Sequence, residues 1–212
     1  MIVAIAGATG LTGSYCLDFL LLQIKITKVI VIGRKSTGIK NPKLEEVILK
    51  DNQLTSKVVA DAFICCLGTT IKKAGSKEAF KEIDLKLPVY LATNLHKNGC
   101  KISAVISAMG ADENSAFFYN QVKGKMENAM QMIGFESLSI FRPSIIKGAR
   151  KETRMAEKMG LAVMKTISPF FFGTFKNYKP IHAKIIGRSL MAVVLMRKHG
   201  TNIYLSEDIK KV

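Results

Sequence analysis

The sequence predicts a single α/β domain in which one parallel sheet is covered by helices on both faces. Short runs rich in β-branched residues alternate with longer helical stretches, a pattern typical of this class. Two of the runs, 29–32 and 63–67, are apolar without interruption, as expected for strands that are buried on both faces. A glycine-rich turn follows the first run and opens the first helical stretch. Together these observations favour a doubly wound, Rossmann-like sheet.

The elements of this fold can be assigned in chain order. Each expected strand is a short apolar run that a turn or a helical stretch follows. The crossover at 50–60 is short and has room for only a stub of helix, and a late run at 202–205 could add one more strand. Helices are expected around 11–22, 77–98 and 117–133. Strands are expected at 2–6, 28–32, 45–49, 62–67, 102–107 and 137–141.

Composition argues against several classes of protein. Of the 212 residues, 48% are hydrophobic and 23% are charged, which are ordinary values for a globular domain and unlike those of a disordered chain. No apolar run approaches the roughly 18–20 residues that span a bilayer, and the opening residues lack the basic region of a signal peptide. The four cysteines and three histidines show no metal-binding spacing. We therefore expect a cytoplasmic protein with no metal site and no transmembrane segment.

Positive charge is concentrated in the last third of the chain. The formal net charge is +16, and residues 142–198 contribute +11 of it. This stretch is either a solvated surface that favours solubility or a positive face for an anionic substrate, an acidic partner or a membrane surface. No helix-turn-helix, zinc finger or aromatic RNA-binding motif accompanies the charge, so no specific nucleic acid is expected. The phenylalanines at 170–172 are either core residues or part of a dimer, partner or peripheral membrane contact.

The glycine-rich turn has the spacing GxxGxxG. Gly7 at the end of the first strand permits a tight turn, Gly10 lets the main chain approach a pyrophosphate, and Gly13 lets the helix pack closely on the sheet. The phosphates would meet free main-chain N–H groups at the positive end of the helix dipole. Because the motif lies between a buried strand and a helix, it predicts dinucleotide binding.

The second strand is followed by two cations, Arg34 and Lys35. NAD-preferring sites usually carry an acidic residue at this place, where it binds the ribose 2′-hydroxyl. A guanidinium can instead bind a 2′-phosphate through several donors and stack beside the adenine. NADP(H) is therefore favoured over NAD(H), and the alternative is that both residues are merely exposed turn residues.

Tyr119 and Lys123 have a YxxxK spacing, which places both side chains on one face of the third expected helix. The ordinary pKa of tyrosine is about 10, and a nearby ammonium group would lower that of Tyr119. The lysine could also hold the nicotinamide ribose. Ser107, at the end of the fifth strand, could donate a hydrogen bond to a carbonyl oxygen. The three residues predict a hydride-transfer site at the carboxyl ends of the strands.

With these motifs the chain resembles an atypical short-chain dehydrogenase/reductase, and most of all the Tat-interacting-protein-like oxidoreductases. The matching stretches, 7–13, 66–70, 107–112, 119–124 and 141–143, span residues 1 to about 148. Two departures are Ala108, where relatives often have a second serine, and the short crossover at 50–60. The resemblance implies that Gly7, Thr9, Gly10, Leu11 and Gly13 hold the pyrophosphate and that Arg34 and Lys35 bind the 2′-phosphate. It further implies that Leu67, Gly68 and Thr69 line the path to the nicotinamide, that Pro143 and Ser144 pass near it, and that Ser107, Tyr119 and Lys123 form a reductase triad.

We interpret residues 1–212 as one domain, with a nucleotide-binding sheet at 1–141 and a substrate-side lid with closing elements at 142–212. The expected activity is NADPH-dependent hydride transfer to a small carbonyl or conjugated substrate. The alternative is a non-catalytic NADP(H)-binding regulatory protein, and both a monomer and a homodimer remain open. Of two further polar residues, Asp84 is expected on a solvated helix face. His182 is expected to begin the closing helix in a structural or capping role, and the alternative is a substrate contact.

Overall fold

The structure is a computed structural model that describes residues 1–148 and 179–212. Its strands are β1 (Ile2–Ala6), β2 (Lys28–Gly33), β3 (Leu44–Ile48), β4 (Ala62–Cys65), β5 (Ile102–Ile106), β6 (Ser137–Arg142) and β9 (Gly200–Leu205). They form one sheet in the order β3-β2-β1-β4-β5-β6-β9, and every neighbouring pair is parallel. The chain builds outward from β1 in both directions, so the sheet is doubly wound. The predicted fold class is confirmed.

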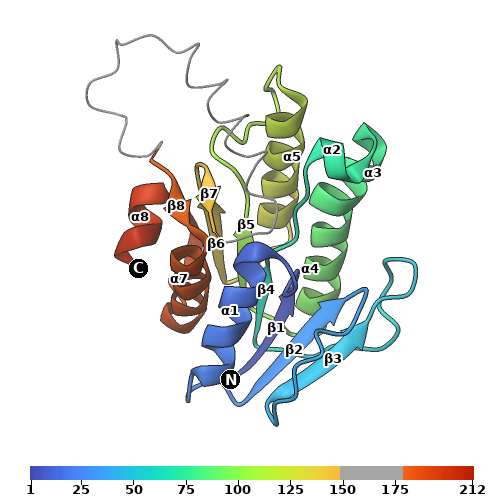
Figure 1. Cartoon of the computed structure of the whole chain (residues 1–212), viewed down its shortest axis with the longest axis vertical. Helices are drawn as coiled ribbons and strands as arrows, with labels where there is room; N and C mark the ends of the chain where they lie inside the picture. Colours follow the sequence, from blue (N-terminus) through green and yellow to red (C-terminus); the bar gives the residue numbers. More distant parts are fainter. Residues whose placement is uncertain (149–178) are drawn as a thin grey trace.

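Helices cover the two faces of this sheet, and each face has its own apolar core. On one face α1 packs beside α7, and on the other α4 lies beside α5 (Figure 1). The first pair approaches closely because of Gly187, where a Cβ would lie 2.8 Å from the main-chain nitrogen of Cys16. These four helices are α1 (Leu11–Leu22), α4 (Leu87–Lys97), α5 (Phe118–Met132) and α7 (Ala183–Met196).

The second predicted helix, 77–98, is divided into three consecutive parts. It consists of α3 (Lys77–Lys81), a π-helical segment η1 (Glu82–Lys86) and α4. A short helix that the sequence did not indicate, α2 (Ile71–Ala74), precedes it and ends at Gly75, whose φ of +87° lies in the left-handed region. The crossover at 50–60 contains no helical stub, only an isolated bridge between Lys50 and Gln53. The other predicted elements agree with the structure within two residues at each end.

The C-terminal residues complete the main sheet. β9 pairs with β6, and α7 packs on α1. His182 precedes α7, and its Nδ1 accepts a hydrogen bond from the amide of Lys184 at 3.1 Å, so the capping role is confirmed. Three further elements are β7 (Ile146–Lys147), β8 (Ile181–His182), which pairs with β7, and α8 (Ser206–Lys211). Most of the expected lid, including the phenylalanines at 170–172, lies outside the described residues.

Two features are absent from the described residues. None of their helices has the length and apolar character needed to cross a bilayer. Within the same residues, no three His, Cys, Asp or Glu side chains gather in a way that could hold a metal ion.

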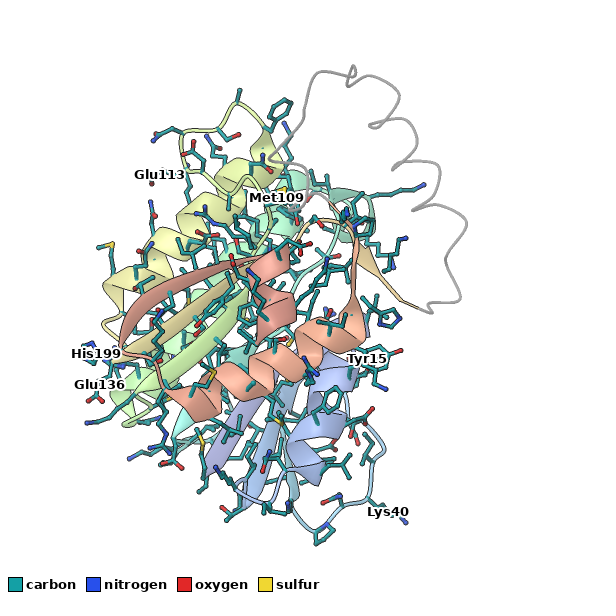
Figure 2. All side chains as sticks on the ribbon, turned by 90° about the vertical axis from the view of Figure 1, so that its left-hand side faces the viewer. Tyr15, Lys40, Met109, Glu113, Glu136 and His199 are labelled. Carbon is teal, nitrogen blue, oxygen red and sulfur yellow. The ribbon has the colours of Figure 1, made fainter. Side chains whose placement is uncertain are left out.

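The two ends of the sheet can be distinguished in Figure 2. Met109 and Glu113 follow β5 and lie at the end where the parallel strands finish, whereas Glu136 and His199 precede β6 and β9 and lie at the opposite end. Ligands of open α/β sheets bind outside the carboxyl ends of the strands. All the site residues named from the sequence lie in the loops after β1, β2, β4, β5 and β6 or at the helix starts that follow them.

Candidate functional site

The turn after β1 has room only for glycine at two of its three motif positions. Gly7 has a φ of +81°, and a Cβ there would lie 2.6 Å from the carbonyl group of Cys66. A Cβ at Gly13 would collide with the main-chain oxygen of Gly7. The turn is closed by a hydrogen bond from the amide of Gly10 to that same oxygen, at 3.0 Å. The backbone itself therefore forms the floor of this turn.

The helix that follows this turn begins without a side-chain cap. Gly10 is the N-cap residue of α1, no side chain accepts a hydrogen bond from the first turn, and no acidic residue lies in it. The first amides of a helix have no partner within the helix, and the helix dipole favours an anion at this end. The uncapped amides and the glycine turn fit a pyrophosphate. Thr9 is exposed beside them.

A cleft beside the turn extends toward the end of β2. Arg34 and Lys35 are exposed at its rim, and Leu67 joins it from the loop after β4. Three leucines that the sequence analysis did not identify, Leu49, Leu87 and Leu91, add apolar surface. Leu87 and Leu91 lie four residues apart on α4, so the sequence is enough to place them on one face of the helix. The sequence does not show that this face lines the cleft. An apolar cleft with cations at its rim fits a purine with a phosphorylated ribose.

The loop that carries the two cations is held by a glutamate on β3. The amide and the hydroxyl group of Thr37 both donate to Oε1 of Glu46, each at 2.6 Å. Hydrogen bonds from Ser36 and then from Thr37 hold the pKa of Glu46 below its ordinary value. The loop that begins at Arg34 is therefore tied to the neighbouring strand. Glu46 was not identified from the sequence.

Lys123 is buried and forms an ion pair with Asp84. Its Nζ lies 2.7 Å from Oδ1 of Asp84, and the two side chains are 4% and 1% exposed. The other carboxylate oxygen accepts a hydrogen bond from the amide of Thr69 at 2.9 Å. The expectation that Asp84 lies on a solvated helix face is therefore wrong. Asp84 belongs to the π-helical segment η1, whose wider turn changes which side of the helix is buried, and the 3.6-residue pattern of the sequence does not show this.

The charge of Asp84 changes the expected state of Tyr119. Although 37% of the Tyr119 residue is exposed, burial around its phenol group raises its pKa, Lys123 lowers it and Asp84 raises it again, so that the net direction is upward. Lys123 thus lowers the pKa of Tyr119 as expected. The combined effect of burial, Lys123 and Asp84 nevertheless raises this pKa, so the expected lowering is wrong. Burial alone would lower the pKa of Lys123, but Asp84 and Tyr119 raise it. Both residues therefore keep their protons over the ordinary pH range.

Ser107 presents a buried hydroxyl group at the end of β5. Its Oγ has no hydrogen-bond partner among the described residues, while its amide donates to the carbonyl of Phe141 at 2.7 Å. Buried polar groups normally have partners, so such a hydroxyl group is a candidate ligand-binding group. Ser103 has the same property near the start of β5. The position of Ser107 at the strand end is what distinguishes it.

The loop after β5 is fixed to the first turns of α5. The amide of Asp112 donates to the carbonyl of Asn120 at 3.1 Å. A Cβ at Gly124 would collide with the main chain of Asp112 and Glu113. These contacts join the loop that begins at Ser107 to the helix that carries Tyr119 and Lys123.

The two residues expected after β6 have different surroundings. The carbonyl of Pro143, which is buried, accepts a hydrogen bond from the amide of Met109 at 3.1 Å. The hydroxyl group of Ser144 donates to the carbonyl of Lys179 at 2.7 Å and accepts from the hydroxyl group of Ser206 at 3.0 Å. The side chain of Ser144 is therefore engaged within the protein, which does not favour its expected role beside a nicotinamide.

The glycine turn and the YxxxK helix are brought together by the loop after β4. The main-chain nitrogen of Leu67 lies 2.8 Å from the position of a Cβ on Gly7. The next residue, Gly68, faces the other half of the site, because its Cβ position lies 3.9 Å from Nζ of Lys123. One short loop thus contacts both halves of the candidate site.

Comparison with known proteins gives one family match and several relatives. A model described as "NAD dependent epimerase/dehydratase family" matches residues 3–195. "Protein FMP52, mitochondrial" of Candida albicans is 31% identical over 194 residues, which cover 87% of this chain and 83% of the relative. "Protein HTATIP2" of Rattus norvegicus is 35% identical over 162 residues, which cover 73% and 66%, respectively. The resemblance to the Tat-interacting-protein-like branch is confirmed.

Solved structures with the same fold are much less similar in sequence. WbmH of Bordetella bronchiseptica in complex with NAD+ has a TM-score of 0.71 at 18% identity, over 99% of this chain and 78% of that one. UDP-glucuronic acid 4-epimerase of Bacillus cereus in complex with NAD has a TM-score of 0.68 at 15% identity, over 97% and 78%. At these identities the comparison shows the fold alone.

Proposed function

Because this chain belongs to the NAD dependent epimerase/dehydratase family, we propose that it is an NADPH-dependent oxidoreductase that reduces a small carbonyl or conjugated substrate. The observation that carries this proposal is the loop at Leu67 and Gly68, which contacts the glycine turn on one side and Lys123 on the other. A dinucleotide laid along this loop would run from the phosphate-binding helix to the YxxxK helix.

The residues of the site divide between holding the cofactor and acting on the substrate. The free amides at the start of α1 and the glycine turn would hold the pyrophosphate, and Arg34 and Lys35 would bind the 2′-phosphate. Bound NADPH would supply a hydride. Ser107 would donate a hydrogen bond to the substrate oxygen, and Tyr119 would give that oxygen a proton. Lys123 would bind the nicotinamide ribose beside Gly68.

The preference for NADPH over NADH follows from the two cations at the rim of the cleft. Both residues are exposed, and the loop that they begin is tied down by Glu46. A guanidinium carried by such a loop can form several hydrogen bonds to a phosphate. The glutamate itself accepts two hydrogen bonds from Thr37. It therefore does not act as the free acidic residue that a ribose 2′-hydroxyl would need.

The proposal is tested with the purified chain in two steps. Calorimetric titration with NADPH and NADH should show saturable binding, tighter for NADPH. NADPH oxidation should then be followed against a panel of aldehydes, ketones and quinones, with Tyr119→Phe as the matched variant that retains cofactor binding. No binding of either coenzyme at millimolar concentration would overturn the proposal. An unchanged rate in Tyr119→Phe would overturn the role of that residue.

A second outcome of the panel would favour the regulatory alternative. If NADPH binds but no compound is reduced, a non-catalytic role becomes the better explanation, and capture of a protein partner should then depend on NADPH.

The location of the protein in the cell is a separate prediction. The names of the fungal relatives include "mitochondrial", so imaging of the tagged chain should decide between mitochondria and the expected cytoplasm.

A further inference from the structure

We propose that Asp84 is a positioning residue of this site, which holds the ammonium group of Lys123 and the amide of Thr69 on the two oxygens of one buried carboxylate. This inference rests on the proposed function, because it assigns Asp84 to the proton-donating half of a reductase. Neither the glycine motif nor the YxxxK spacing includes Asp84. It lies 39 positions before Lys123 in the chain.

The geometry places this carboxylate, which η1 carries, between two other segments. Oδ1 of Asp84 lies 2.7 Å from Nζ of Lys123 on α5, and Oδ2 lies 2.9 Å from the amide of Thr69 in the loop after β4. The Cβ position of Gly68 is 3.5 Å from Oδ1. The carboxylate therefore fixes the loop that would line the cofactor relative to the helix that carries the proton donor.

The local fold brings Asp84 to this position. Asp84 lies in η1, a five-residue π-helical segment between α3 and α4, and is fully buried. π-helical turns are rare and are often found at functional sites. Phe80 at the end of α3 packs against the ring of Tyr119, with the ring centroids 5.6 Å apart. The helix that leads directly into this segment is therefore in contact with the proposed proton donor as well.

Stability does not by itself explain a buried ion pair. Removing two charges from water costs much of what their attraction returns, and well-packed apolar residues are often as stable in such a place. Glu127, four residues after Lys123, provides a comparison within the same helix. It is 2% exposed and binds Arg142. Glu127 pairs with a cation on β6, whereas Asp84 pairs with the lysine of the YxxxK motif.

The charges around Lys123 determine how the group of residues behaves. The titratable groups that face one another are Asp84 on η1, Lys123 and Tyr119 on α5, and Cys65 on β4. Burial raises the pKa of the Cys65 thiol to about 12, so this thiol stays neutral. The negative charge of Asp84 compensates the positive charge of Lys123 and opposes ionisation of Tyr119. The phenol is thus kept ready to donate a proton, as a reduction requires.

The experiment compares Asp84→Asn with Glu127→Gln. Each variant removes the charge of one buried carboxylate from an ion pair that holds α5. In the full chain without cofactor, phenolate absorbance is followed against pH, and the Tyr119 signal is obtained by subtracting the same background with Tyr119→Phe. In Asp84→Asn the Tyr119 transition should move to lower pH by about 1–3 units, because Lys123 is then uncompensated. In Glu127→Gln it should stay within a few tenths of a unit of its original position.

Two results would overturn the proposal: no downward movement in Asp84→Asn, or an equal movement in both variants. If Asp84→Asn does not fold, Lys123→Met is compared with the double variant Asp84→Asn, Lys123→Met. Tyr119 should then titrate at lower pH in the double variant, and equal transitions would overturn the proposal. The titration needs neither coenzyme nor substrate. A failure here would therefore leave the reductase proposal intact, and an inactive enzyme would leave the titration interpretable.

Discussion

The guanidinium group of Arg142 forms an ion pair with the buried carboxylate of Glu127. Nε of Arg142 lies 3.0 Å from Oε1, and its terminal nitrogen lies 2.6 Å from Oε2. This contact joins the last residue of β6 to the helix that carries Tyr119 and Lys123. Two ion pairs therefore anchor α5, one through Lys123 to η1 and one through Glu127 to the sheet.

Removal of this arginine should destabilise the protein markedly. Arg142→Ala leaves a carboxylate that is 2% exposed without a counter-charge, which should cost about 3 kcal/mol in the free energy of unfolding. Glu127→Gln should cost less, because the half-buried guanidinium can turn toward water. Denaturant unfolding of both variants measures the difference, and equal losses would contradict this explanation.

The glycines of the turn should separate folding from cofactor binding. Gly13→Ala places a Cβ against the main-chain oxygen of Gly7 and should cost about 1–3 kcal/mol of stability. Gly10→Ala is the matched control, because its Cβ would lie 3.2 Å from that oxygen and needs only a small adjustment. It should fold almost normally but lose at least about tenfold in NADPH affinity, since the new methyl group would occupy the phosphate approach. Thermal melts with and without NADPH test both expectations.

The coenzyme preference should depend on Arg34. Arg34→Ala should weaken NADPH binding by about 10–100-fold and leave NADH binding nearly unchanged, because only the former has the 2′-phosphate. Lys40→Ala is the control, since Lys40 is an exposed cation six positions later. It lies far from Met109, which marks the end of the sheet where the strands finish (Figure 2). Calorimetric titration with both coenzymes gives the ratio. Equal losses for NADPH and NADH would show that Arg34 does not read the 2′-phosphate.

Two buried serines of β5 and its end offer a matched pair for the substrate-binding role. Ser107 and Ser103 both have a buried hydroxyl group without a partner among the described residues. Removing such a group should be neutral or slightly stabilising in both alanine variants. Turnover should fall by about 100-fold in Ser107→Ala only, because a donor to the substrate oxygen is lost there. A similar fall in Ser103→Ala would indicate a general effect on the strand.

Much of the fold and part of the site could be predicted because they depend on local patterns. The uninterrupted apolar runs identified the buried strands, and the glycine spacing identified the turn whose main chain has no room for side chains. Tyr119 and Lys123 could be paired because four residues make about one helical turn. Asp84 was misjudged for the same reason, since its charged neighbours Lys81, Glu82 and Lys86 suggested an exposed face of a regular helix. The π-helical segment breaks that regularity.

By itself the sequence determined the strands and the glycine turn and indicated candidate residues for a nucleotide, because backbone sterics and hydrophobic periodicity act over a few neighbours. Only the tertiary structure decided which distant groups share the space around Lys123. Asp84 reaches it from η1, and Gly68 and Thr69 reach it from the loop after β4. Leu49 and Leu87 likewise line the cleft beside the glycine turn, and Glu46 holds the loop after β2. Their distances depend on how helices pack on the sheet and on one widened turn, and a single sequence contains no direct measure of either.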